Sequence, residues 1–215
     1  MQVVDGNERS SRAARPWLTS YPEGCPADIE VPDTPLPEAF EEAAERWKKR
    51  PALIFYGRKI RYGELKDLVN RFAAALHSLG VRKGDLVALF LLNCPQFVIA
   101  YLGCLKVGAV VVPVNALSVT PELKRLLEDS GARTIVCQDI LFEFVEKAGA
   151  RLDNTIVAGI GDYLPPTKKF FGATFLKVLY QKMQIPSARI RQDPHIYSFE
   201  ALLKENEPHP PSVRI

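Results

Sequence analysis

The chain has 215 residues, of which 47% are hydrophobic and 25% are charged, and its formal net charge is +3. This composition is that of an ordinary globular protein, and a chain of this length can bury a substantial core. The small net charge argues against a general nucleic-acid binder. We expect neither a secretory signal nor a membrane span, because the amino terminus has no continuous apolar stretch and no apolar run reaches the length of a bilayer.

The cysteines at positions 25, 94, 104 and 137 form no C-x-x-C pair, and no histidine lies near them at zinc-ligand spacing. Three of them lie inside apolar segments, where a thiol behaves as a small hydrophobic group. We therefore expect free thiols, no metal site and a reducing, cytoplasmic location.

The first part of the chain predicts an arm followed by a helix. Residues 1–34 contain four prolines and little periodicity, which predicts an extended arm lying on a surface, for example that of a neighbouring subunit. Apolar residues then recur at helical spacing over Leu36–Lys49, with Asp33 or Thr34 expected as the cap. The basic group Lys48-Lys49-Arg50 suits the carboxyl end of a helix, where cations complement the helix dipole.

A hairpin and a long helix come next. Ala52–Tyr56 and Lys59–Tyr62 predict two short strands, and Gly57-Arg58 between them predicts a tight turn. The apolar stripe along Glu64–Leu79 predicts the clearest helix of the chain. Gly80 is placed to end that helix in the left-handed conformation.

After this helix, nearly continuous apolar runs alternate with helical patterns. Runs that are apolar on both faces predict strands of a buried parallel sheet, and right-handed crossovers place helices on both of its faces. The predicted strands are Asp85–Leu92, Ala109–Val114, Thr134–Cys137 and Thr155–Ala158, and the predicted helices are Pro95–Val107, Pro121–Asp129 and Leu141–Lys147. We expect Gly108 to end the first of these helices and Thr120 to cap the second. The fold class is therefore α/β, with a doubly wound, mostly parallel sheet, an extended arm and a small β-hairpin.

The last part of the chain departs from this alternation. Thr167–Met183 predicts a helix, Ile196–Phe199 a short strand and Phe199–Lys204 a helical turn or two. Three prolines between positions 208 and 211 then form a stiff segment, from which we expect the polypeptide to continue beyond Ile215. The predicted organisation is an arm at 1–34, an α/β unit at 35–160, and a basic helical segment with a linker at 161–215.

Three stretches carry a resemblance to a known family. They are Arg15-Pro16-Trp17-Leu18 with Ser20-Tyr21-Pro22-Glu23-Gly24, then Ile60–Gly84 with Tyr62-Gly63-Glu64-Leu65 and Val81-Arg82-Lys83-Gly84-Asp85, and Asn93-Cys94-Pro95 through Lys106-Val107-Gly108-Ala109-Val110-Val111-Val112-Pro113-Val114-Asn115. In this order and spacing they resemble the amino-terminal part of acyl-adenylate-forming (AMP-binding) enzymes, and in particular long-chain fatty-acid CoA ligases. Their prolines and glycines also begin and end helices and strands, so these motifs indicate the fold rather than catalysis.

The resemblance implies an enzyme that activates a carboxylate with ATP and Mg²⁺ and passes the acyl group to CoA. The family uses a Ser/Thr/Gly-rich phosphate loop ending in Lys-Gly and a lysine on a mobile carboxy-terminal domain. No position here matches either, and Gly159-Ile160-Gly161 lacks a following Lys-Ser/Thr. The histidines at 77, 195 and 209 have no partner at catalytic spacing. We therefore assign no catalytic, cofactor-binding or metal residue, and expect a fragment of a medium- or long-chain fatty-acid CoA ligase that is inactive alone and binds no cofactor.

Residues 163–191 hold six Lys or Arg and no Asp or Glu, interleaved with bulky apolar residues. A basic helix with bulky apolar residues can lie in a membrane interface. Alternatively its apolar face packs on the sheet while the lysines are solvated, or the lysines attract the phosphates of CoA. The candidates for membrane or CoA-side contact are Lys168, Lys169, Phe171, Phe175, Lys177 and Lys182.

Two other hypotheses stay open. One is another adenylating enzyme, such as an aromatic-acid CoA ligase, and the other is a non-catalytic α/β binding module that is complete as it stands. A Ser/Thr/Gly-rich loop ending in Lys-Gly downstream of Ile215 would favour a ligase, whereas a stop codon there would favour the module. The expected partners are a fatty acid and CoA, a second copy bound through the arm, and a membrane contacted peripherally, but no nucleic acid.

Overall fold

The computed structural model describes residues 15–165, 193–210 and 213. The predicted helix over Thr167–Met183 and the candidate membrane or CoA-side residues from Lys168 to Lys182 lie outside the described residues. Among those described, no helix is both long and apolar enough to span a bilayer.

The chain divides into two compact units, Met1–Thr34 and Pro35–Ile215. In the first, the short 3-10 helix η1 (Pro16–Ser20) has no buried residue, and Arg15 forms an ion pair with Asp28. The other described residues of this unit form neither helix nor strand, as expected of an extended proline-rich arm.

The second unit begins with helix α2 (Leu36–Arg46). The predicted caps Asp33 and Thr34 are wrong, because Pro35 occupies the N-cap position without a side-chain bond and its carbonyl accepts the first backbone hydrogen bonds. The helix also ends earlier than predicted. Lys48-Lys49-Arg50 therefore lie in the turn after α2, beyond its carboxyl end.

Strands β1 (Pro51–Phe55) and β2 (Arg58–Arg61) form the predicted antiparallel hairpin. Its turn is Tyr56-Gly57 and not Gly57-Arg58, because both central residues of the observed turn have positive φ, 49° and 94°, as a two-residue type I′ turn requires. In the resulting register Leu53 and Ile60 pack on the core, whereas Ile54 and Lys59 are paired on the outer face.

The two predicted glycine helix ends are confirmed. Helix α3 (Tyr62–Ser78) ends at Gly80, whose φ is 88°, and the Val81 N–H donates to the Leu76 carbonyl. Helix α4 (Pro95–Lys106) ends in the same way at Gly108. Both ends are Schellman motifs, in which a left-handed residue lets two backbone N–H groups reach back to the last turn.

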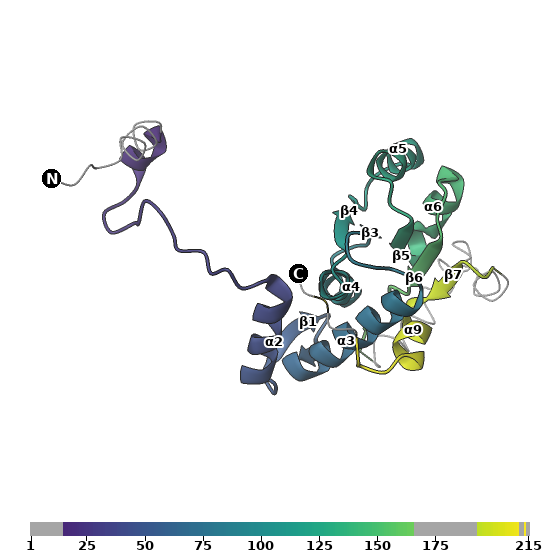
Figure 1. Cartoon of the computed structure of the whole chain (residues 1–215), viewed down its shortest axis with the longest axis horizontal. Helices are drawn as coiled ribbons and strands as arrows, with labels where there is room; N and C mark the ends of the chain where they lie inside the picture. The colour runs from purple at the N-terminus through teal and green to yellow at the C-terminus, as the bar shows by residue number, and fades with distance from the viewer. Residues whose placement is uncertain (1–14, 166–192, 211–212, 214–215) are drawn as a thin grey trace. The chain divides into compact units, whose positions relative to one another are not determined.

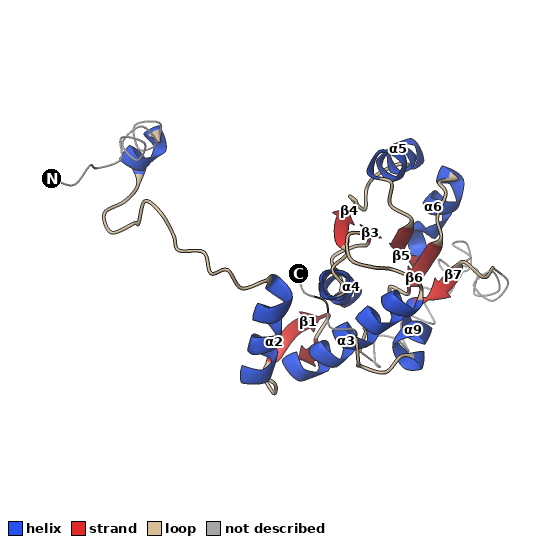
Figure 2. Cartoon of the chain, viewed as in Figure 1, coloured by secondary structure: helices blue, strands red, loops and turns tan. Residues whose placement is uncertain are grey.

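The described strands of the main sheet are all parallel, and their order is β4-β3-β5-β6-β7 (Figure 2). They are β3 (Leu86–Phe90), β4 (Val110–Pro113), β5 (Thr134–Gln138), β6 (Asn154–Ala158) and β7 (Ile196–Ser198). The chain passes from β3 to one neighbour, β4, and then returns to the other side of β3 to form β5. The order of the strands therefore reverses between β3 and β5.

Helices cover both faces of this sheet (Figure 1). One face packs on α3, α4 and α9 (Phe199–Glu205), and the other on α5 (Thr120–Ser130) and α6 (Phe142–Ala148), the latter preceded by the 3-10 turn η2 (Asp139–Leu141). Alternate residues of β3 belong to the two cores, Val87 and Leu89 to the first and Ala88 and Phe90 to the second. The predicted doubly wound α/β fold is thus confirmed.

The cap of α5 differs from the prediction. Thr120 is the first helical residue, and Val119 holds the N-cap position. The Glu122 carboxylate accepts a hydrogen bond from the Val119 N–H at 3.3 Å. The side chain of the third helical residue thus accepts the hydrogen bond of the N-cap N–H, and no hydroxyl group caps the helix. The prediction of Thr120 as the cap is therefore wrong.

Candidate functional site

The strand order reverses at the carboxyl ends of β3 and β5, and we call this edge of the sheet, with the polar residues that meet there, the crevice. The connection after β3 leads to α4 on one face of the sheet, and the connection after β5 leads to α6 on the other. In doubly wound sheets ligands bind outside the strand ends at such a point. Polar side chains from the ends of three strands meet here: Cys94, Gln96, Gln138, Asp139 and Asp162.

Gln138, the last residue of β5, is fully buried. Its Nε2 donates to the Ala158 carbonyl at 2.9 Å, at the end of β6. Its Oε1 lies 3.5 Å from the Cys94 Sγ, just before α4. One carboxamide therefore joins the ends of two strands and the start of a helix.

Asp139 is a buried carboxylate beside Gln138. Its two oxygens accept hydrogen bonds from the backbone N–H groups of Ile140 at 2.7 Å and Ile160 at 3.1 Å. Loss of hydration raises the pKa of Asp139 to about 6, with the two N–H groups opposing the shift and Asp162 adding to it. The carboxyl group therefore titrates well above the usual range of an aspartate.

Gln96, in the first turn of α4, is fully buried and donates from Nε2 to the Gly159 carbonyl at 2.7 Å. Its Oε1 has no hydrogen-bond partner among the described residues. The Gly159 N–H donates to Asp162 Oδ2 at 3.0 Å, and a Cβ on Gly159 would lie 2.5 Å from that carboxylate. The glycine-rich loop is thus closed on side chains of its own chain, and any side chain at position 159 would force the Asp162 carboxylate to shift.

The polar groups of the crevice have a structural role. Burial raises the pKa of the Cys94 thiol, which keeps it protonated and weakly nucleophilic at neutral pH. Nowhere in the described part of the chain do three or more His, Cys, Asp or Glu residues gather as metal ligands. The carboxylates of the crevice are bonded to N–H groups of this chain, and their negative charge repels phosphate, so these residues do not fit the phosphates of a nucleotide, which need cations and free N–H donors.

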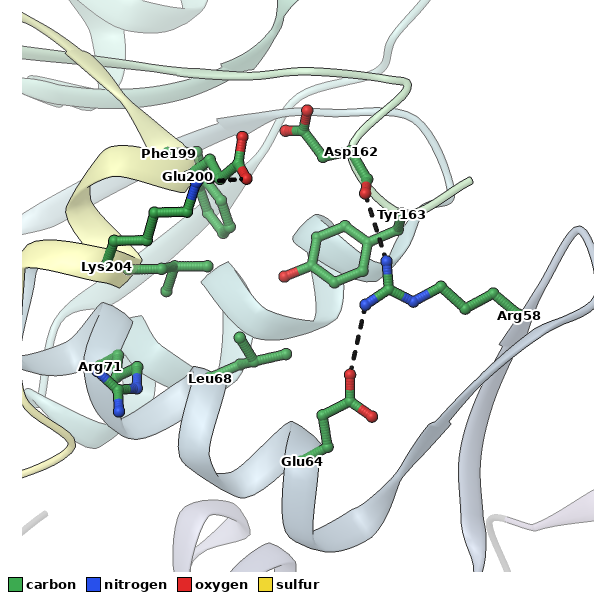
Figure 3. Close-up of a pocket in the computed structure, with 10 residues that line it drawn as sticks. Arg58, Glu64, Leu68, Arg71, Asp162, Tyr163, Phe199, Glu200 and Lys204 are labelled. Atoms are coloured by element: carbon green, nitrogen blue, oxygen red, sulfur yellow. Dashed lines mark hydrogen bonds and ion pairs between the residues drawn. The ribbon is translucent and has the colours of Figure 1, made fainter. Parts of the chain in front are cut away.

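A pocket of about 540 Å³ lies next to the same loop (Figure 3). Its lining residues come from the hairpin, α3, the loop after β6 and α9: Arg58, Glu64, Leu68, Arg71, Asp162, Tyr163, Phe199, Glu200, Leu203 and Lys204. The Arg58 guanidinium lies 4.8 Å from the centre of the Tyr163 ring, donates to the Asp162 carbonyl and pairs with Glu64 at 3.4 Å. Lys204 pairs with Glu200 at 2.8 Å. The charges in this pocket are balanced, so it shows no preference for an anion or a cation.

The residues of the crevice were not predicted from the sequence. The available signal was the pair Gln138-Asp139 directly after an apolar strand, together with Gln96 inside an apolar helix. Only the strand order shows that these positions meet. The histidines lie elsewhere: His77 in the last turn of α3, His195 with its Nδ1 3.0 Å from the Asp153 carbonyl, and His209 after α9, where its backbone N–H donates to the Glu207 carbonyl at 2.8 Å.

The chain matches the AMP-binding enzyme family over residues 40–178. It is 31% identical over 198 residues to a long-chain-fatty-acid–CoA ligase of Bacillus subtilis (strain 168), covering 91% of this chain and 34% of that protein. It is 37% identical over 180 residues to the corresponding ligase of Yersinia pestis, covering 80% of this chain and 32% of that protein. The chain thus spans about a third of the length of the curated relatives that it matches.

Solved structures share this fold. A benzoate CoA ligase from Burkholderia xenovorans LB400 matches with a TM-score of 0.64 at 22% identity, over 85% of this chain and 30% of that chain. The N-terminal subdomain of Klebsiella oxytoca NpsA matches with a TM-score of 0.51 at 26% identity, over 82% of this chain and 33% of that chain. The family match covers more than half of the sequence and agrees with the doubly wound fold, and the chain therefore belongs to the acyl-adenylate-forming, AMP-binding enzyme family.

Proposed function

We propose that this chain is the amino-terminal part of an ATP-dependent CoA ligase for medium- or long-chain fatty acids, which forms an acyl-AMP and then an acyl-CoA. The observation that supports a fatty acid is the similarity, over 91% of the chain, to a protein named long-chain-fatty-acid–CoA ligase. The benzoate CoA ligase shares 22% identity, which speaks for the fold alone. A ligase of aromatic acids is the second candidate, because the chain is 37% identical over 138 residues to a protein named 4-coumarate–CoA ligase-like 9 of Oryza sativa subsp. japonica.

In this proposal the described residues form a scaffold. The crevice holds the loop Gly159–Tyr163 at the carboxyl edge of the sheet, and its acceptor oxygens do not suit phosphate. ATP, Mg²⁺ and CoA would therefore be held largely by other parts of a longer polypeptide. The 215-residue chain would neither adenylate a fatty acid nor bind these cofactors by itself.

Pyrophosphate exchange into ATP tests this proposal. The measurement compares the 215-residue chain with a polypeptide extended beyond Ile215, each with a long-chain fatty acid or benzoate. We expect exchange by the extended protein only, and more with the fatty acid. Exchange by the 215-residue chain would contradict the assignment of a scaffold, and a preference for benzoate would transfer the proposal to the aromatic-acid ligases.

Three further parts of the proposal concern organisation: a homodimer formed through residues 1–34, a division into 35–160 and 161–215, and a cytoplasmic enzyme whose segment 163–191 contacts the membrane. Light scattering of a variant lacking residues 1–34 tests the dimer, since an unchanged mass would contradict it.

Limited proteolysis, with the fragments identified by mass, tests the division. Alanine at Lys168, Lys169, Lys177 and Lys182 tests the membrane contact, since unchanged sedimentation with anionic liposomes would contradict it.

A further inference from the structure

A second basic stretch, outside residues 163–191, lies entirely within the described structure. Between positions 46 and 61 the chain contains seven Lys or Arg residues and no Asp or Glu, whereas the whole chain carries only +3. The seven are Arg46, Lys48, Lys49, Arg50, Arg58, Lys59 and Arg61. This stretch covers the end of α2, the turn after it and the whole β1–β2 hairpin.

The fold gathers these charges at one place. The turn after α2 is joined to the exit of the hairpin by two backbone bonds, from the Tyr62 N–H to the Arg50 carbonyl and from the Gly63 N–H to the Lys48 carbonyl, each 3.0 Å. The Trp47 and Tyr62 rings pack 5.9 Å apart across the same junction. Because α2 ends at Arg46, the cations of the following turn lie next to the base of the hairpin.

The strand register sorts the hairpin residues between two faces. Leu53 and Ile60 are paired and face the core, so their neighbours Ile54 and Lys59 are paired on the outer face. Arg61 follows Lys59 by two positions and shares that face, where it is exposed. We call Lys48, Lys49, Arg50, Ile54, Tyr56, Lys59 and Arg61 the basic hairpin surface.

None of the cations of this surface forms an ion pair with a described carboxylate, although Lys48 lies close enough to Glu45 to help lower the pKa of that carboxyl group. Of the seven Lys and Arg residues between positions 46 and 61, only Arg58 forms an ion pair with a described carboxylate, and its partner Glu64 belongs to the inner pocket. By contrast, the cations on α5 and α6 pair with acidic residues one turn away, as Lys124 does with Glu128 and Lys147 with Glu143. The hairpin therefore presents net positive charge.

Large apolar side chains stand among these cations. Ile54 is 66% exposed, at the centre of the outer face, and Tyr56 is 63% exposed at the tip of the turn. Exposed cations alone attract any polyanion, but an aliphatic and an aromatic side chain between them match a surface with an apolar interior and an anionic rim. The headgroup region of a bilayer has this character.

The backbone conformation at the hairpin turn supports a role for the Tyr56 side chain in binding. Its φ of 49° lies in the left-handed region, which Asn or Gly adopts more readily than an aromatic residue. The Tyr56 ring makes an edge contact with Phe55, with ring centres 4.7 Å apart. An aromatic residue thus stands at a strained and solvent-exposed position where folding alone favours Asn, and such positions occur where a side chain serves another purpose.

We propose that the basic hairpin surface binds the anionic headgroup region of a phospholipid membrane, with Tyr56 and Ile54 inserted at the interface and Lys49, Lys59 and Arg61 on lipid phosphates. This surface shares no residue with segment 163–191 or with the carboxyl-edge crevice. It does not depend on the proposed ligase activity.

Vesicle sedimentation of the 215-residue chain tests this proposal, with phosphatidylcholine vesicles compared with vesicles that also contain phosphatidylglycerol. We expect binding to the anionic vesicles that weakens as salt is raised. Each cation at an anionic surface contributes a factor of about 5 in binding, so the triple variant Lys49→Gln, Lys59→Gln and Arg61→Gln should bind roughly 100-fold more weakly.

A matched control removes the same charge elsewhere. Lys124→Gln, Arg125→Gln and Lys147→Gln together also lower the net charge by three, but they remove cations that are paired with neighbouring carboxylates on α5 and α6. This control should bind the anionic vesicles within about 5-fold of the parent, the contribution of a single interfacial cation. An equal loss in both triple variants would show that only net charge matters and would overturn the assignment of a surface.

Tyr56→Asn separates binding from folding. Asparagine tolerates the left-handed conformation, so the variant should keep or raise the Tm of the parent while its binding to anionic vesicles falls several-fold. Unchanged binding by this variant, or a loss of binding caused solely by replacing the lysines of segment 163–191, would contradict the proposal. Binding to a single-stranded oligonucleotide by the parent but not by the hairpin triple variant, without any sedimentation with vesicles, would assign the surface to nucleic acid instead.

Discussion

The crevice at the carboxyl edge of the sheet and the basic hairpin surface are both polar, and they differ in how that polarity is satisfied. In the crevice, Gln138, Asp139 and Gln96 are buried and bonded to backbone groups of neighbouring strands and loops. On the hairpin, Lys59 and Arg61 are exposed and form no ion pair with a described carboxylate. Buried bonded groups contribute to folding and specify a conformation, whereas exposed charges leave folding nearly unaffected and are available to a partner.

The largest expected effect lies in the crevice and depends on pH. Because the pKa of Asp139 is raised to about 6 in the folded protein, between about pH 4 and pH 6 the folded state holds a proton that the unfolded chain has released. The contribution of Asp139 to the free energy of unfolding should therefore fall by about 3 kcal/mol as pH rises through this window. Denaturant unfolding at a series of pH values measures it.

Asp139→Asn is the control for this pH dependence, since an amide does not titrate. The difference in unfolding free energy between parent and variant should change between pH 4 and pH 6 and level off above pH 6. If this difference stays constant between pH 4 and pH 6, the Asp139 carboxyl group is not desolvated. Asp139 would then resemble the exposed charges of the hairpin.

The next effect separates two buried glutamines. Gln138→Met should lower the free energy of unfolding by about 2 kcal/mol, because it leaves the buried Ala158 carbonyl without its side-chain donor. Gln96→Met should cost about 1 kcal/mol or less, because it removes one bond to Gly159 but also a buried oxygen without a described partner. Equal losses in chemical denaturation would indicate that a water molecule satisfies the Gln96 oxygen.

A third effect has the opposite sign. Tyr56→Asn should raise the free energy of unfolding by about 1 kcal/mol, since the turn residue then adopts positive φ with less strain. Thermal unfolding with Lys59→Asn as a comparison measures this gain, because Lys59 lies in β2 and not at the tip. A loss of stability in Tyr56→Asn would show that the contact with Phe55 outweighs the strain.

The smallest effect is expected for the hairpin charges. Lys59→Gln and Arg61→Gln should each change the free energy of unfolding by no more than about 0.5 kcal/mol, because exposed cations without a described partner contribute little to folding. Urea unfolding of both variants checks this. A cost comparable to that of Gln138→Met would place these side chains among the structural contacts and remove the difference between the two regions.

Most of the architecture could be predicted from local patterns. The alternation of apolar runs and helical stripes gives the parallel sheet with two covered faces, since a strand that is buried on both sides has no polar alternation. Gly80 and Gly108 mark helix ends because only a residue that tolerates positive φ closes a Schellman motif. The wrong predictions of Asp33, Thr34 and Thr120 concern helix starts. Pro35 takes the N-cap position of α2, and the Glu122 carboxylate accepts the N-cap hydrogen bond of α5.

The sequence by itself therefore determined the order and type of the elements, because hydrophobic period and glycine conformation are properties of neighbouring residues. The tertiary structure alone decided that β3 lies between β4 and β5, and hence that Gln96, Gln138 and Asp139 meet. It also decided that the hairpin turns at Tyr56-Gly57, which placed Ile54 and Lys59 on the outer face. Strand order and register depend on packing between distant segments, and local patterns carry no information about which distant segment is the partner.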